Sequence, residues 1–132
     1  MKEPVFLNKE QVLQLHKRTL EDYGGSTGIR DEGLLDSAIF QPEASFGGVF
    51  LHDSLFLMAA AYYFHISQNQ PFMDGNKRTG FLSLFTFLKI NGFTFNAPNE
   101  TIYPFLIEVA EKRKTKDDLA VFIENNSTRT IL

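Results

Sequence analysis

The hydrophobic pattern near the start of the chain predicts two helices with polar caps. The first helix is expected to open at Asn8, with Gln11 three residues later, and to run to Tyr23, where a Gly-Gly pair stops it. Asp31 can cap a second, shorter helix that ends before Pro42. The apolar positions on one side of this second helix are Leu34, Leu35, Ala38 and Ile39.

Two later segments are apolar nearly all round, which is typical of helices buried on most sides. The first starts at Asp53 or Ser54, contains LFLMAAAYYF and runs to about Gln68. The second runs from about Asn76 to Asn91 and is closed by a Gly. We therefore expect two central buried helices joined by a short polar loop.

The remaining elements are short. Residues 43–52 (EASFGGVFLH) place a Gly-Gly pair between apolar residues, which predicts an exposed hairpin or flap. A fifth helix is expected over about Pro104 to Lys112, because Pro is favourable at a first helical position. A last helix is expected from its cap at Thr115 to about Asn125. With little strand signal outside the flap, the sequence predicts an all-α single domain over residues 1–132.

Composition and charge narrow the classes of function. The chain has 132 residues, 43% of them hydrophobic and 14 of them Phe, which supports one domain with a real core. A net charge of −3 argues against a nucleic-acid or anionic-membrane partner. Without Cys there is no disulfide scaffold and no thiol-based metal site. The start has no apolar stretch of signal-peptide length, so a cytoplasmic location is expected.

The candidate chemistry gathers in the loop NQPFMDGNKRTG, between the two apolar helices. Pro71 and Phe72 can anchor this loop, and Gly75 allows a sharp turn and the close approach of a ligand. The first N–H groups of the helix that follows are unpaired, so they attract anions. Lys77 and Arg78 add positive charge, and Arg can hold a phosphate through two parallel hydrogen bonds.

Asp74 supplies a carboxylate suited to a Mg²⁺ ion that bridges phosphates. Together with the Gly-Asn-Lys-Arg run it predicts a triphosphate-plus-Mg²⁺ site, different from a Walker loop, whose G-x-x-x-x-G-K-[ST] pattern is absent. Taken singly, these residues are more typical of helix caps and solvated surface. Two cations in a first helical turn are electrostatically disfavoured, however, so an anion is their natural partner.

PFMDGNKRTG resembles the signature of the Fic/Doc family in its Doc (death-on-curing) branch, H-P-F-x-D-[GA]-N-K-R-[TS]-[AG]. The resemblance extends at least from Phe6 to Phe93 and implies a Fic/Doc-type helical bundle. The AMP-transferring Fic enzymes typically read D-G-N-G-R-x-x-R. This chain has Lys77 at the second Gly and Phe81 at the final Arg, and both departures favour the Doc type.

The resemblance implies an ATP-dependent toxin of a toxin–antitoxin pair, with an antitoxin protein as one partner. Its target would be a threonine hydroxyl of elongation factor Tu, which it would phosphorylate, and the flap would dock the target segment by strand pairing. Carried over by position, the roles are Mg²⁺ binding for Asp74, lining of the anion hole for Gly75 and Asn76, and binding of the transferring phosphates for Lys77 and Arg78.

Gln70 is the position at which the chain departs from the family's pattern. The family has His there, the general base that takes the proton from the attacking hydroxyl, and an amide cannot exchange a proton near neutral pH. Loss of a general base costs ~10²–10⁴-fold in rate, so we expect a weak or silent enzyme with an intact nucleotide site. Gln70 is either natural, in a degenerate binder, or a detoxifying substitution; the sequence leaves both open.

The other histidines offer no obvious replacement base. His65 is interpreted as a satisfied helix-face residue, His52 as a surface or target-contact residue, and His16 as a packed, hydrogen-bonded residue. Four functions stay open: a Doc-like toxin impaired by Gln70, a non-catalytic module that binds nucleotide or an antitoxin, a plain interaction domain that binds no ATP, and an AMP transferase of the wider Fic type.

Overall fold

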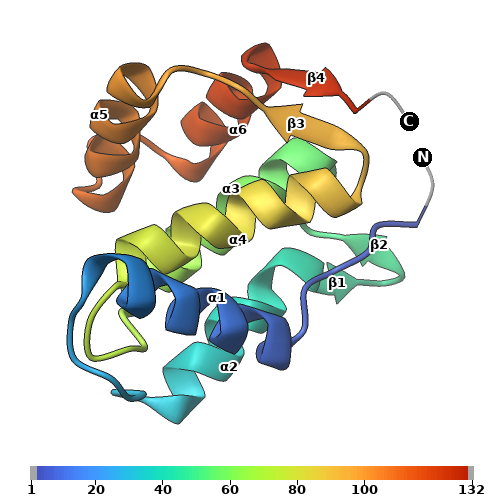
Figure 1. Cartoon of the computed structure of the whole chain (residues 1–132). Helices are drawn as coiled ribbons and strands as arrows, with labels where there is room; N and C mark the ends of the chain where they lie inside the picture. The colour runs from blue at the N-terminus through green and yellow to red at the C-terminus, as the bar shows by residue number, and fades with distance from the viewer. Residues whose placement is uncertain (1–2, 131–132) are drawn as a thin grey trace.

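Helices make up most of the computed structural model, which describes residues 3–130 (Figure 1). The predicted all-α class, with two central helices and a short hairpin, is confirmed. In chain order the elements are α1 (Lys9–Tyr23), α2 (Glu32–Phe40), the 3₁₀ turn η1 (Gln41–Glu43), β1 (Ser45–Phe46), β2 (Val49–Phe50), α3 (Leu55–Asn69), α4 (Asn76–Ile90), β3 (Phe93–Phe95), α5 (Asn99–Ala110), α6 (Lys116–Asn125) and β4 (Ser127–Arg129).

The core is built around α3, which packs most extensively on α4 and also contacts α2, α5 and α6. Residues 58–63 of α3 are all buried, and three of them are alanines that let the neighbouring helices approach closely. Gly80 of α4 serves the same close packing: a Cβ there would lie 3.2 Å from the backbone oxygen of Tyr63. The contact of α3 with α4 therefore fixes where the loop between them begins and ends. No helix within residues 3–130 combines the length and apolarity needed to cross a membrane.

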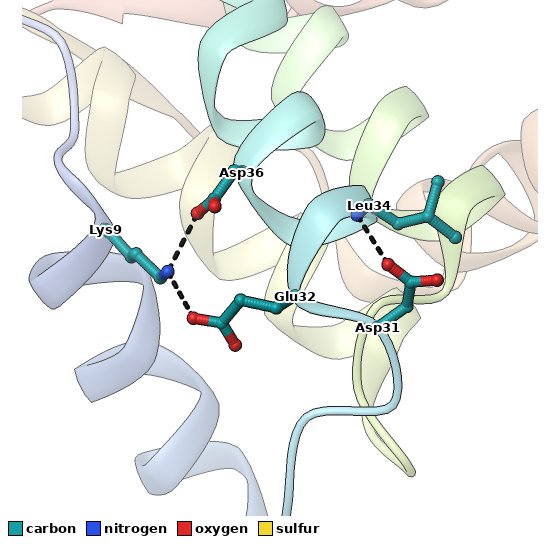
Figure 2. Close-up of polar contacts among 5 residues, drawn as sticks. All are labelled: Lys9, Asp31, Glu32, Leu34 and Asp36. Carbon is teal, nitrogen blue, oxygen red and sulfur yellow. Dashed lines mark hydrogen bonds and ion pairs between the residues drawn. The ribbon is translucent and has the colours of Figure 1, made fainter.

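Local capping explains why α1, α2 and α6 begin where the sequence predicts. Asn8 Oδ1 accepts a hydrogen bond from the Gln11 backbone N–H at 2.9 Å, and the Gln11 side chain accepts one from the Asn8 N–H. Asp31 caps α2 by accepting from the Leu34 N–H at 2.9 Å (Figure 2). Thr115 caps α6 in the same reciprocal way.

Lys9 joins the starts of α1 and α2. Its ammonium group pairs with Glu32 and lies 2.8 Å from Asp36 Oδ1 (Figure 2). Because all three side chains are more than a third exposed, solvent screens these pairs and they add little to the stability of the fold. They orient the two helices more than they stabilise the fold.

Helix α5 corrects one prediction, because it begins at Asn99 and carries Pro104 inside it. The carbonyl that loses its N–H partner to the proline ring belongs to Glu100, an exposed residue that water can reach. Ile102, Leu106 and Val109 meanwhile bury one continuous face of α5. The gain from that burial explains why the helix starts five residues before the proline.

Strands β3 and β4 are two short strands outside the flap that the sequence did not indicate. They pair antiparallel, with Phe93 opposite Arg129 and Phe95 opposite Ser127. Each strand has three residues, too few to show an alternating pattern, and β4 contains no apolar residue. Pairing follows from the tertiary structure, since Phe95 is buried beside α6 and pulls its strand onto the bundle.

The hairpin of β1 and β2 is the predicted flap. Its turn consists of Gly47 and Gly48, which both have positive φ (59° and 81°), as a tight two-residue turn requires. Phe46 and Val49 are 83% and 67% exposed, whereas Phe50 is half-buried against Phe6 with ring centroids 5.6 Å apart. The flap thus presents some of its apolar side chains to solvent and anchors itself through another.

A cluster of His52, His65 and Lys116 ties the flap to α3 and α6. Lys116 Nζ lies 2.9 Å from His52 Nε2 and 3.1 Å from His65 Nε2. An ammonium group only donates, so both imidazoles accept and are neutral in this arrangement. The interpretation of His65 as a satisfied residue is confirmed. The interpretation of His52 as a surface residue is wrong, because it is only 6% exposed.

This cluster predicts a loss of stability in mild acid. Burial, aided by the Lys116 charge, lowers the pKa of His65 to about 4 and also lowers the pKa of His52. In the unfolded chain both would titrate near 6.5. The contribution is therefore complete above pH 6.5 and is lost as pH falls towards 4. We expect the unfolding free energy to fall by about 1–2 kcal/mol between pH 7 and pH 5, measured by urea denaturation.

The matched variant is His65→Gln, whose amide oxygen can still accept from Lys116 but cannot take up a proton. The pH dependence over the same window should shrink in this variant. An unchanged slope would show that the acid sensitivity arises elsewhere.

Candidate functional site at the start of α4

The loop between α3 and α4 makes two sharp turns, one at each end. Gln70 follows α3 in a left-handed conformation (φ 47°, ψ 57°), and its N–H donates to the Ile66 carbonyl at 3.1 Å. Gly75 precedes α4 with φ 80°. The left-handed conformation costs a residue with a Cβ about 1–2 kcal/mol. The contacts around Gln70 must therefore hold its backbone in this conformation.

Phe72 anchors the middle of the loop. Its side chain is 1% exposed and its ring stacks on the His16 imidazole, with centroids 3.7 Å apart. Both backbone groups of Phe72 are bonded to Asn76: the N–H donates to Oδ1 at 2.9 Å, and the carbonyl accepts from Nδ2 at 3.0 Å. The Asn76 side chain is therefore used to hold the loop, and its backbone N–H is the group left for a ligand.

His16 supports the loop from α1. Its Nε2 donates to the Asp74 carbonyl at 2.9 Å, because a carbonyl only accepts, and the residue is 7% exposed. A Cβ on Gly75 would lie 3.2 Å from Thr19 Cγ2, which shows how closely the loop rests on α1. The prediction that His16 is a packed, hydrogen-bonded residue is confirmed. Position 75 requires glycine for two reasons, its positive φ and the lack of space for a Cβ beside Thr19.

The first turn of α4 leaves its donors available. The earliest helical bond runs from the Thr79 N–H to the Gly75 carbonyl at 2.9 Å, and no side chain caps the helix. The N–H groups of Asn76, Lys77 and Arg78 precede that bond, and the side chains of Lys77 and Arg78 are exposed. The predicted anion-binding residues thus lie together, although their role in binding stays a prediction.

Asp74 is positioned by a contact that the sequence did not indicate. One of its carboxylate oxygens, Oδ2, accepts from the Ser26 backbone N–H at 2.7 Å, which leaves Oδ1 for a ligand. Residues 3–130 contain no group of three or more His, Cys, Asp or Glu side chains that could hold a metal. A Mg²⁺ ion fits this site nevertheless, because it usually takes only one or two protein carboxylates and completes its shell with phosphate and water.

The segment between α1 and α2, residues 24–31, braces the loop along its length. Figure 1 shows this segment running beside the loop that leads into α4. The backbone N–H groups of Arg30 and Asp31 donate to the Pro71 carbonyl at 2.6 and 3.1 Å, and the Met73 N–H donates to the Gly28 carbonyl at 3.1 Å. The Arg30 side chain donates to the carbonyls of Gln70 and Asn69. No local motif could have indicated this brace, because its partners lie about forty positions apart.

A cavity of about 250 Å³ opens beside the start of α4. Its lining is largely aromatic and aliphatic and includes two cationic side chains from the predicted site. Such a cavity suits a flat, mostly apolar group attached to phosphates. The lining residues are Tyr63, Lys77, Arg78, Phe81, Tyr103, Leu106 and Ile107.

Gln70 contributes only its backbone to these contacts: its N–H bonds to Ile66 and its carbonyl to Arg30, while the residue is exposed. Two of the other histidines are already engaged, His16 with the Asp74 carbonyl and His65 with Lys116. The site described here therefore has the features of an anion site, and neither engaged imidazole stands in for a base at position 70.

Comparison with known proteins gives the class of this protein. The Fic/DOC family matches residues 6–88, more than half of the chain. Toxin Doc of Mycolicibacterium smegmatis is 39% identical over 87 residues, which cover 66% of this chain and 65% of that protein. Protein kinase doc of Escherichia phage P1 is 31% identical over 93 residues, which cover 70% and 73%. The chain spans just under two thirds of the first relative's length.

The chain therefore belongs to the Fic/Doc family, and its relatives place it in the Doc branch. The resemblance inferred from PFMDGNKRTG is confirmed at this level.

Asn76→Ala tests the account of the loop. The change leaves the buried N–H and carbonyl of Phe72 without partners, and we expect it to lower the unfolding free energy by about 1–3 kcal/mol. Asn99→Ala is the matched control, since Asn99 is exposed in the first turn of α5; it should stay within about 0.5 kcal/mol of the wild type. If both changes have the same effect on thermal unfolding, the two hydrogen bonds from Asn76 to the Phe72 backbone do not stabilise the loop as described.

Proposed function

We propose that this chain is a toxin of a toxin–antitoxin module that binds Mg·ATP at the start of α4. Its reaction is transfer of a phosphoryl group to a protein hydroxyl, with a threonine of elongation factor Tu as the target and an antitoxin as the second partner. The observation that carries the proposal is the convergence of Asp74, Lys77, Arg78 and free helix N–H groups in one place. It is supported by relatives whose names are Toxin Doc and Protein kinase doc.

Each part of the site has a task in this proposal. The backbone N–H groups at the start of α4 and the side chains of Lys77 and Arg78 bind the phosphates and neutralise their charge. Asp74 Oδ1 holds Mg²⁺, which when bound supplies further neutralisation of the phosphates. The cavity next to Phe81 and Tyr103 takes the base. The exposed side chains of the flap offer a surface for the target segment.

Gln70 limits the rate and not the binding. An amide cannot accept a proton from the attacking hydroxyl. Phosphoryl transfer, however, relies mainly on positioning and charge neutralisation. The groups proposed for these tasks are Asp74, Lys77, Arg78 and the N–H groups at the start of α4. A set of binding groups without a general base also favours a second candidate, a module that binds nucleotide or an antitoxin through this site without catalysis.

Replacing Gln70 by His distinguishes the two. We expect phosphoryl transfer to elongation factor Tu to rise by ~10²-fold or more, with Mg·ATP affinity nearly unchanged. His tolerates the left-handed conformation at this position better than most residues do, so folding should be unaffected. ATP labelled at the γ- or the α-phosphate separates phosphoryl transfer from AMP transfer.

Gln14→His, on an exposed position of α1, is the matched control and should show no gain. If Gln70→His binds Mg·ATP but transfers nothing to elongation factor Tu or to proteins of a lysate, the binding-module function takes the place of the enzyme.

Arg78→Ala tests the anion site directly. Loss of a charged hydrogen bond should weaken Mg·ATP binding by about 1.5–3 kcal/mol, measured by calorimetry. Arg113→Ala removes an exposed Arg that pairs with Glu111 after α5, and it should leave the affinity unchanged. Equal affinities for the two variants would remove the anion site from the proposal.

A further inference from the structure

We propose that Tyr23, the last residue of α1, is a positioning residue that holds Arg78 ready to bind the phosphates of the nucleotide. The inference rests on the proposed function, since it assigns a role within the same site. The observation behind it is geometric: the Arg78 guanidinium carbon lies 3.6 Å from the centroid of the Tyr23 ring. Nothing in the family signature includes Tyr23, which lies 55 positions before Arg78 in the chain.

The stack matters because Arg78 has little else to hold it. Its side chain is exposed, and the ion pairs found among residues 3–130 do not include it. A free Arg samples many rotamers and loses that freedom when it binds a ligand. A side chain that already stacks on a ring has lost part of this rotamer freedom before the ligand arrives, so the ligand binds more tightly.

Stacking leaves the binding groups of Arg78 available. The guanidinium is flat, and it meets the aromatic ring through its face. Its N–H donors point outward in the plane, which is the direction needed for two parallel bonds to a phosphate. Tyr23 therefore occupies a surface of Arg78 that a phosphate does not need.

The end of α1 is itself fixed against the site. The Gly24 N–H donates to the Leu20 carbonyl at 2.8 Å and closes the helix. Two residues later the Ser26 N–H donates to Asp74 Oδ2, and a Cβ on Gly25 would lie 3.1 Å from Asp74 Cβ. The same short stretch thus reaches the candidate Mg²⁺ ligand and the candidate phosphate ligand. This arrangement favours a role in the geometry of the site over a chance contact of Tyr23, which is 63% exposed.

The test is a double-mutant cycle on Mg·ATP affinity, with Tyr23→Leu, Arg78→Ala and both together. We expect Tyr23→Leu to weaken binding about 2- to 5-fold, the scale of an exposed cation–π contact. Tyr23→Phe keeps the ring and should restore the wild-type affinity. With Arg78→Ala already present, Tyr23→Leu should have no further effect, because its route to the ligand has been removed.

A second readout needs no nucleotide. In NMR spectra of the free protein, the side-chain signals of Arg78 should show an upfield ring-current shift that Tyr23→Leu abolishes and Tyr23→Phe retains. Loss of the shift, with a coupling between the two residues in the affinity cycle, supports the inference.

Two results would overturn it, and they are distinguishable from each other. If Arg78→Ala weakens binding but Tyr23→Leu does not, or Tyr23→Leu weakens binding equally without Arg78, Tyr23 is no positioning residue and the proposed function stands. If the wild type itself does not bind Mg·ATP, the proposed function fails and the role of Tyr23 in nucleotide binding falls with it, even where the ring-current shift is present.

Discussion

The site depends on the burial of Phe72. This side chain is the apolar anchor of a short, polar connection between the two central helices, and its ring is stacked on His16 beneath the loop. Its backbone is held at both polar groups by the Asn76 side chain. Because Phe72 is fixed, the positions of the residues that follow it are fixed as well. Asp74 meets the end of α1, Gly75 turns over Thr19, and α4 starts with its donors outward.

This anchoring divides the motif into residues that hold and residues that are free to act. The Asn76 side chain and the His16 imidazole are used for structure. What is left for chemistry is backbone N–H groups, one carboxylate oxygen of Asp74 and the cations of Lys77 and Arg78. Gln70 takes part only through its backbone, so the contacts that hold the loop do not depend on its side chain.

The sequence was sufficient where the determining contacts are local. Asn8 and Gln11 cap α1 from three residues apart, and the apolar runs of α3 and α4 are continuous, so these elements were predicted closely. Long-range contacts were missed because no local pattern in the sequence indicates them. The pairing of β3 with β4, the burial of His52 under Lys116 and the brace of residues 24–31 on the loop each join distant segments. Pro104 misled the prediction of α5, because an apolar face outweighed one lost hydrogen bond. For the candidate site, the motif indicated which residues gather, and only the structure identified Ser26 and Tyr23 beside them.

The central claim of the proposal is that the start of α4 binds the phosphates of a nucleotide although position 70 carries Gln and not a general base. Backbone amide NMR during a titration with ATP in the presence of Mg²⁺ tests it most directly. The account predicts saturable shifts that are largest at Gly75, Asn76, Lys77 and Arg78, and weaker binding when Mg²⁺ is withheld. Saturation with no change at these amides, or no response to Mg·ATP anywhere in the chain, would contradict it.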